Sequence, residues 1–372
     1  ERIERSAELK RALIDFASSS RFDRQLTRLM LESAGPGGEL DEGEAITIVD
    51  QFALQHRLLN GKTVLDQFLA SRRDLATADR ELLRGWSDPV EGLFEILGPD
   101  GDAIILLNLL DDLEYRTYSN MGPAIFRQLP KGGFVHARLV AIHPVPDAWL
   151  VSGMMQSYGK SSAPHIAQAA LEMATRYPAL VFRNPEKIEQ GWTMMRHDRA
   201  EFIEFFGTDE LVLPPAEAQA RLAAYYQHRQ VAGRAFEILP PELADADTIG
   251  VIYDEVDGLN FYNDYRMLRD LFANPGLASD KRYSDVLRGY LNSRTVGPLP
   301  FRRLAAAYPE AASLVFQRVL RKPGFSWPEH GEALLLRRKP WYYEREPRPA
   351  VSVAGTRLAE LATLRERRDR GR

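Results

Sequence analysis

The sequence predicts an α+β protein that is mostly α-helical and carries a small antiparallel β-barrel at its centre. Two observations predict this class. Apolar residues recur at helical spacing towards both ends of the chain, whereas short apolar runs separated by Gly and Pro turns fill the stretch between them. These changes of pattern divide the chain into a helical segment (1–88), a barrel (89–160), a helical domain (161–350) and a basic helix or tail (351–372).

The apolar positions of the first part are spaced as in amphipathic helices. Leu9 and Leu13, for example, lie one helical turn apart. The hydroxyl of Thr77 is placed to cap the last of these helices. The predicted helices cover Ile3–Phe16, Phe22–Met30, Asp41–Leu58 and Val64–Leu69, and one more follows Thr77.

In the central part the apolar runs are short and the turns between them are tight. The stretches Gly98–Gly101 and Lys131–Gly133 are turn sequences, because Gly and Pro there favour chain reversal. Closing a sheet of this size is the simplest way to avoid exposed strand edges, so we predict a barrel. The five strands are predicted at Leu93–Leu97, Ala103–Leu110, Tyr115–Tyr118, Phe134–Ile142 and Trp149–Gln156.

Helical spacing returns after the turn at Ser161–Pro164. The longest predicted helix, Glu186–Phe206, is amphipathic. One extended segment, Ile249–Tyr253, interrupts the helices that follow. The other helices are predicted at His165–Tyr177, Pro215–Val231, Tyr265–Phe272, Tyr283–Leu291, Pro300–Tyr308, Ala311–Leu320 and Thr356–Arg370.

Composition excludes several classes of protein. The chain has 372 residues, a formal net charge of −4 and no cysteine. The lack of cysteine excludes disulfides, thiol nucleophiles and clusters or zinc sites held by cysteine. No apolar run approaches the ~18 residues of a membrane span, and the opening Glu1–Arg5 is not a signal peptide. We therefore expect a soluble cytoplasmic protein with no membrane contact.

Charge is segregated along the chain. Between Ala235 and Tyr265 there are eight acidic residues and no Lys or Arg, whereas from Gly297 onwards 16 Lys and Arg stand against 8 acidic residues. Such segregation indicates either two faces of one fold that attract each other or surfaces for separate partners. The second interpretation brings the basic end to a protein or RNA partner, because arginine matches phosphate geometry. The densest basic stretch is the tail, with Arg365, Arg367, Arg368, Arg370 and Arg372.

The acidic stretch contains a candidate metal site. Asp254, Glu255, Asp257 and Asp264 lie around Gly258, and hard cations need several oxygen ligands that a turn can bring together. The spacing is not that of an EF-hand loop. The alternative interpretation is an acidic turn that caps the helix beginning nearby. The sequence identifies no other cofactor, so a divalent metal is the single cofactor hypothesis.

The predicted barrel carries a candidate binding surface. Tyr115, Arg116 and Tyr118 lie on one strand, and small barrels use aromatic rings and cations to bind single strands of nucleic acid. Tyrosine is also a good strand residue, so the alternative is that these rings belong to the core. Further cations nearby in the sequence are Arg127, Lys131 and Arg138.

Known catalytic signatures are incomplete. The seven histidines form no His-Glu-x-x-His pattern, and no Gly-x-Ser-x-Gly elbow is present. The stretch Gly159–Ser161 resembles the end of a phosphate loop, but Met154 stands where the first glycine is required. These observations favour binding over catalysis.

Four stretches resemble a module of uncharacterised bacterial proteins, some of which carry a C-terminal SEC-C zinc motif. The stretches are Phe68–Leu75, Glu81–Leu83, Asn108–Asp112 and Gly133–Val140. The resemblance covers about a quarter of the chain and implies a helix that leads into a small barrel, with no established activity. A SEC-C motif requires cysteines, so it is absent here and no zinc-dependent partner is implied.

We therefore expect a non-enzymatic binding or adaptor protein that acts through the barrel and the basic C-terminal region. The alternative is a metal-assisted hydrolase that uses the acidic cluster between Asp254 and Asp264. The sequence does not indicate the oligomeric state.

Overall fold

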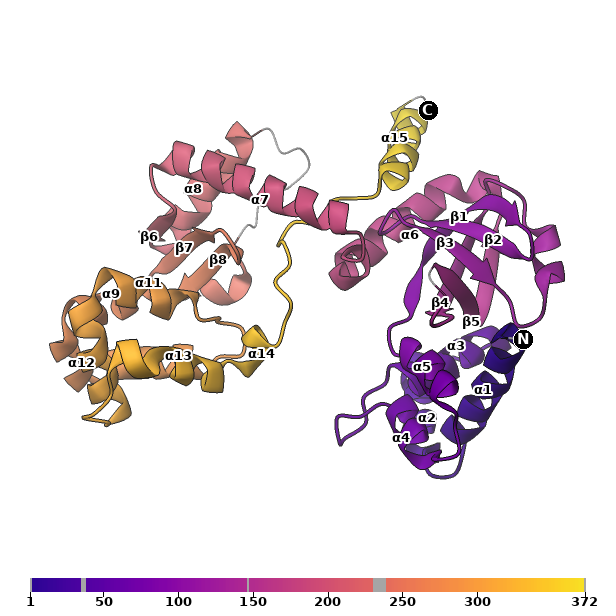
Figure 1. Ribbon diagram of the computed structural model, residues 1–372. Helices are drawn as coiled ribbons and strands as arrows, with labels where there is room; N and C mark the ends of the chain where they lie inside the picture. Colours follow the sequence, from indigo (N-terminus) through magenta and orange to yellow (C-terminus); the bar gives the residue numbers. More distant parts are fainter. Residues whose placement is uncertain (1, 35–37, 146, 230–238, 371–372) are drawn as a thin grey trace. The chain divides into compact units, whose positions relative to one another are not determined.

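The computed structural model describes residues 2–34, 38–145, 147–229 and 239–370, and of residues 364–370 it describes the helix only. The α+β class is confirmed, because the described residues form fifteen α-helices and eight β-strands (Figure 1). None of the described helices is long and apolar enough to cross a membrane.

The chain folds into two compact units. The first comprises Glu1–Lys187 together with Ser352–Arg372, and the second comprises Ile188–Val351. The predicted boundary at residue 350 lies next to the end of the second unit at Val351, whereas those at residues 88 and 160 fall inside the first unit, because the predicted helical segment and barrel share an apolar core. Phe68 of an N-terminal helix, for instance, belongs to the same buried cluster as Val140 and Leu150 of the central sheet.

A closed sheet of five strands is the centre of the first unit. Each strand pairs with two others, in the order β1-β2-β3-β5-β4 and back to β1. The pairing of β3 with β5 is parallel, so the predicted purely antiparallel sheet is wrong and the sheet is mixed. Strand directions can alternate around a ring only when the number of strands is even, and five strands therefore require a parallel pair. The strands are β1 (Val90–Asp100), β2 (Ala103–Asn108), β3 (Glu114–Tyr118), β4 (Phe134–Ala141) and β5 (Ala148–Tyr158).

Five N-terminal helices pack beside the sheet, where α3 contacts β5 and α5 contacts β4 (Figure 1). Their core is aromatic. Phe16 packs edge to face against Phe22 and Phe68, and Phe22 packs in the same way against Phe52. The helices are α1 (Arg2–Ala17), α2 (Asp23–Ala34), α3 (Glu42–Leu54), α4 (Val64–Ser71) and α5 (Thr77–Gly85).

The helix starts differ in how they are capped. Helix α3 begins at a capping box in which Asp41 and Glu44 bond each other's backbone N–H groups. The predicted Thr77 cap is wrong, because Ala76 occupies the N-cap position of α5 and makes no side-chain hydrogen bond. The capping box of α3 thus holds two carboxylates in fixed positions, and α3 itself packs against β5 of the sheet.

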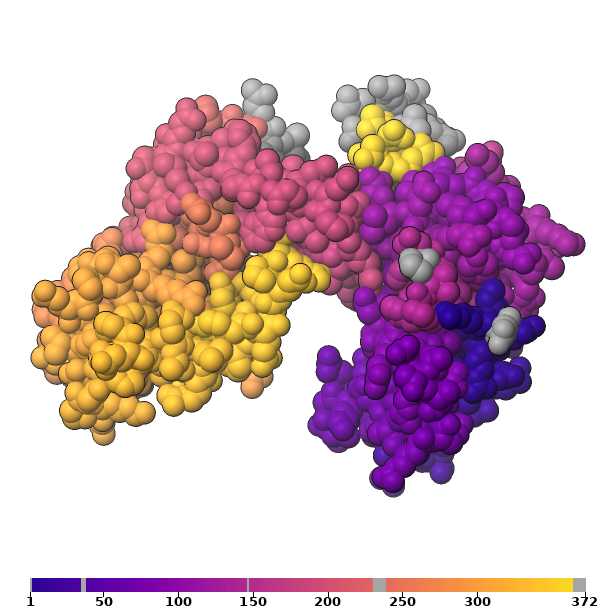
Figure 2. Space-filling model, viewed as in Figure 1, coloured from indigo at the N-terminus to yellow at the C-terminus, as the bar shows by residue number. Residues whose placement is uncertain are grey.

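Helix α6 (Ala163–Arg176) and the C-terminal helix α15 (Thr356–Arg370) complete the first unit. Leu358 of α15 is buried in one cluster with Ile166 of α6 and Phe134 of β4. In Figure 2 the yellow residues of α15 lie on the surface of this unit. The segment predicted as a separate tail therefore starts with residues that belong to the core of the first unit.

The second unit combines a three-stranded antiparallel sheet, in the order β6-β7-β8, with several helices (Figure 1). Strand β7 is the predicted extended segment. We did not predict β6, which has four residues, or β8, whose Gly and Asn residues are typical of turns. The strands are β6 (Glu210–Leu213), β7 (Ile249–Asp254) and β8 (Gly258–Asn263).

Helix α7 begins within the first unit and continues into the second. We did not predict α13, because Pro328 and Gly331 in its sequence are typical of helix breaks. The predicted end of α8 near Val231 lies outside the described residues. The helices are α7 (Pro185–Phe206), α8 (Pro215–His228), α9 (Tyr265–Ala273), α10 (Lys281–Asn292), α11 (Leu299–Ala307), α12 (Pro309–Leu320), α13 (Trp327–Arg338) and α14 (Pro340–Tyr343).

A buried lysine stabilises the end of α10. The side chain of Lys339 is fully buried, and its Nζ donates hydrogen bonds to the carbonyl oxygens of Tyr290 at 2.6 Å and Ser293 at 2.7 Å. These carbonyls lie in the last turn of α10 and just after it, where a cation also interacts favourably with the helix dipole. Burial lowers the pKa of Lys339 to about 8.

Replacing Lys339 by Met is expected to change how stability depends on pH. The folded pKa of about 8 lies below the ordinary value of 10.5. Between these values the unfolded chain binds more protons than the folded chain, so the free energy of unfolding of the wild type rises with pH. From about pH 7.5 to about pH 9.5 the wild type should gain about 2 kcal/mol more than Lys339→Met, as measured by urea unfolding. Equal pH dependence of the two proteins would contradict this account.

Candidate ligand-binding site

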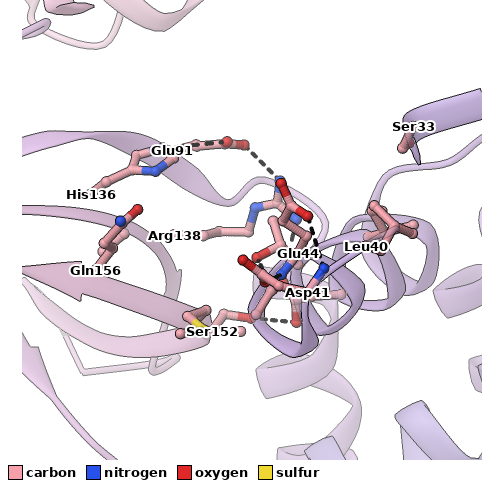
Figure 3. Close-up of a pocket in the computed structure, with 16 residues that line it drawn as sticks. Ser33, Leu40, Asp41, Glu44, Glu91, His136, Arg138, Ser152 and Gln156 are labelled. Atoms are coloured by element: carbon pink, nitrogen blue, oxygen red, sulfur yellow. Dashed lines mark hydrogen bonds and ion pairs between the residues drawn. The ribbon is translucent and has the colours of Figure 1, made fainter. Parts of the chain in front are cut away.

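The first unit contains a pocket between helix α3 and the strands β4 and β5 that is lined by both charged and apolar side chains (Figure 3). Its volume is about 400 Å³. Helix α3 and the residues before it form one wall, and the strands form the opposite wall. The lining residues are Ser33, Leu40, Asp41, Gly43, Glu44, Thr47, Ile48, Asp50, Glu91, His136, Ala137, Arg138, Ser152, Gly153, Met154 and Gln156.

A bulge in β5 shapes the strand wall. The pairing of β4 with β5 changes register between His136 and Arg138, and three residues of β5 that begin with Gly153 stand opposite one residue of β4. Gly153 has a φ of +73°, a left-handed conformation that favours glycine. The next residue, Met154, meets Gly43 of α3, where a Cβ atom would lie 2.5 Å from the Met154 sulfur. Glycine at this point of α3 therefore permits the helix to approach the bulge.

Buried charges form the floor of the pocket, with Asp50 of α3 at their centre. Asp50 forms an ion pair with Lys10 of α1 and a second one with Arg138 at 3.3 Å, and it accepts a hydrogen bond from the Ser152 hydroxyl at 2.9 Å. Arg138 Nη2 donates to Glu91 Oε2 at 2.6 Å. Asp50 is 2% exposed and Arg138 is 5% exposed. Each of these two buried charges is therefore paired, Asp50 with two cations and Arg138 with two carboxylates, as buried charges require.

The lysine of this network is placed beside a serine. Lys10 Nζ donates to Ser152 Oγ at 2.7 Å. Burial lowers the pKa of Lys10, and the neighbouring Asp50 carboxylate opposes that effect. These bonds connect α1, α3 and β5.

Two nitrogen atoms at the strand wall lack hydrogen bonds. Within the described part of the chain, His136 Nε2 and Arg138 Nε are buried and have no hydrogen-bond partner. Glu91 lies between them: its Oε2 accepts from Arg138, while its Oε1 is 3.9 Å from His136 Nε2. Buried polar atoms are nearly always hydrogen-bonded. Both residues line the pocket, so two nitrogens at its strand wall have no acceptor from the described part of the chain.

Two carboxylates stand on the helix wall. Asp41 Oδ1 accepts from the backbone N–H of Glu44 at 2.8 Å, and Glu44 Oε2 accepts from that of Asp41 at 3.0 Å. Both side chains are exposed. In the part of the chain that the structure describes, the second oxygen of each carboxylate has no hydrogen bond. In Figure 3 the Arg138 side chain extends from the strands towards this pair.

The predicted binding residues of the sheet do not share one surface. Tyr115 is buried, and its hydroxyl donates to Asp111 at 2.6 Å, so this ring belongs to the core and its prediction as a stacking residue is wrong. Arg138 is buried in the pocket floor, so its prediction as a surface cation is also wrong. The predicted cations that are exposed are Arg116, which pairs with Asp100 and bonds the hydroxyl of Tyr118, together with Arg127 and Lys131.

The predicted metal site lies in the second unit, and its carboxylates have other partners. Asp254 Oδ1 accepts from backbone N–H groups of its own turn, and Asp257 accepts from the hydroxyl of Tyr342 and from Arg345. Glu255 pairs with Arg199 at 3.4 Å and Asp264 accepts from the backbone N–H of Asp247 at 3.1 Å. No group of three or more His, Asp or Glu residues among those described is arranged to hold a metal ion.

The predicted basic tail lies largely outside the described residues. Helix α15 continues to Arg370, but the side chains of Arg365, Arg367, Arg368 and Arg370 lie outside the described residues, as does all of Arg372. Contact between the acidic and basic segments does occur in the second unit, where Arg345 pairs with Asp257 at 2.5 Å.

Sequence reasoning missed the pocket, because its residues come from segments that are far apart in the chain. Lys10, Asp50 and Ser152 attracted no functional interpretation. A weak signal was available: Arg138 interrupts an apolar strand, and both of its neighbours, Ala137 and Leu139, are buried. A charged residue in such a run indicates a buried ion pair, although it does not identify the partner.

Comparison with known proteins identifies no relative, so the site is interpreted from the chemistry of its own residues. No family model matches the chain, and neither a curated protein nor a solved structure matches it. The resemblance to the bacterial module associated with SEC-C motifs therefore stays a prediction.

Removing Asp50 is expected to destabilise the first unit strongly. Asp50→Ala leaves Lys10 and Arg138 without their shared carboxylate, and breaking a buried ion pair from one side costs about 3–5 kcal/mol. Urea unfolding measures this loss. The matched control is Asp15→Ala on the exposed side of α1, which should change the free energy of unfolding by less than about 0.5 kcal/mol. A loss below about 1 kcal/mol for Asp50→Ala would show that the network is not needed.

Proposed function

We propose that the protein is a non-enzymatic binding protein and that its recognition site is the pocket between α3 and the strands β4 and β5. The observation that carries this proposal is the pair of buried nitrogen atoms, His136 Nε2 and Arg138 Nε, which have no hydrogen-bond partner in the described chain. An unpaired buried polar group costs about 1–3 kcal/mol. A ligand that supplies an acceptor removes this cost, and the removal favours the bound state.

The rest of the floor supports binding over catalysis. Asp50, Lys10 and Ser152 bond one another, and Asp50 and Ser152 are buried, so these side chains hold the pocket's shape without presenting a reactive group. The alternative of a metal-assisted hydrolase at Asp254–Asp264 is less well supported. Its carboxylates Glu255 and Asp257 are already paired with arginines.

Other parts of the expected function remain predictions. The basic C-terminal region, expected to contact a protein or RNA partner, adds no argument, because its arginine side chains from residue 365 onwards lie outside the described residues. The cytoplasmic location and the bacterial source likewise stay predictions.

A panel of small polar metabolites tests the pocket by thermal unfolding. A ligand present at about 100 times its dissociation constant should stabilise the wild type by ~2.7 kcal/mol. Thr47 of α3 lines the pocket, and Thr47→Trp should fill it and abolish the shift. Gln51→Trp is the matched control, because Gln51 is exposed on the same helix and does not line the pocket. Ligand shifts that survive in Thr47→Trp would place binding elsewhere, and no shift with any carboxylate-bearing compound would count against the proposal.

A further inference from the structure

The strand wall of the pocket requires a hydrogen-bond acceptor from a ligand, whereas the helix wall requires a hydrogen-bond donor. On the strand wall, Arg138 Nε lacks an acceptor, and so does His136 Nε2 in the tautomer that carries the proton on this nitrogen. Arg138 is cationic and 5% exposed, so an anionic oxygen makes a stronger bond to it than a neutral one. A carboxylate, with two oxygens in one plane, is the simplest group that can accept from two neighbouring nitrogens.

On the helix wall, Asp41 and Glu44 need a donor. Each uses one oxygen in the capping box and keeps the other for a further donor. The pocket lining carries four carboxylates and one guanidinium, and Lys10 behind it adds one more cation. The excess of negative charge therefore disfavours a purely anionic ligand and favours one with a cationic group.

Neither charge alone satisfies the site. An amine without a carboxylate leaves Arg138 Nε and His136 Nε2 unpaired, and a carboxylate without an amine faces Asp41 and Glu44. Apolar side chains of Leu40, Ile48 and Met154 complete the lining.

We propose that the ligand is a free α-amino acid with an aliphatic side chain, an inference that rests on the pocket being a ligand site. Its carboxylate accepts from Arg138 and His136, whose side chains must turn to bring these buried nitrogens to the pocket surface. Its ammonium donates to Asp41 and Glu44, and its side chain packs against the apolar residues of the wall.

Isothermal titration calorimetry with three matched probes tests the ligand class. L-leucine carries both charges, 3-methylbutylamine lacks the carboxylate and 4-methylpentanoate lacks the amine. We expect leucine to bind at least about tenfold more tightly than either, because each missing group removes a charge-assisted hydrogen bond. Equal binding of the amine or of the acid would overturn the proposal, as would the absence of leucine binding. If other metabolites still bind and Thr47→Trp blocks them, the pocket is a ligand site and only the ligand class is wrong.

Two pairs of variants test the two walls. Glu44→Gln removes a charge but keeps the capping box, which accepts Gln at this position, and should weaken leucine binding about tenfold. Glu42→Gln, in the same helical turn but outside the pocket lining, should leave it unchanged. His136→Ala should weaken leucine binding about fivefold to tenfold, whereas His165→Ala on the exposed side of α6 should not. If each pocket variant binds leucine as its control does, the assignment of the walls is wrong.

Discussion

The first unit depends on a network of four paired charges around two side chains, Asp50 and Arg138, that are buried. Lys10, Asp50, Arg138 and Glu91 come from α1, α3, β4 and β1, so their charges balance only when all four elements are assembled. Apolar contacts tolerate small shifts of a helix along a sheet, whereas a buried ion pair loses most of its stabilisation when its atoms separate. The network therefore determines where the N-terminal helices sit on the closed sheet.

The pocket follows from the same assembly. The bulge that begins at Gly153 of β5 lies at the place where α3 approaches through Gly43. Arg138 contributes to both features, because its terminal nitrogens belong to the ion network while its Nε lacks a hydrogen bond at the pocket wall. Under the proposed function, stability and recognition share this residue, and ligand binding at Arg138 would stabilise the folded first unit.

Local pattern predicted most of the helices and the five strands of the closed sheet, because these segments have regular apolar spacing. It failed where composition contradicts the observed structure, as in β8 with its Gly and Asn residues and in α13 with Pro328. The parallel pair of β3 and β5 could have been inferred, because five strands cannot alternate around a ring. The pocket could not be predicted, because the partners of Asp50 and Arg138 lie 40 to 102 positions away in the chain, and single-sequence spacing carries no information on such pairs.

A crystal structure of the protein as purified from its host tests the central claim most directly, because the claim concerns what completes the bonding of two particular atoms. The account predicts electron density for a bound molecule whose oxygen atoms lie within hydrogen-bond distance of both Arg138 Nε and His136 Nε2. The contradicting result is an empty pocket in which the Glu91 carboxylate has turned to accept from both nitrogens, since the chain would then complete its own bonding and need no ligand.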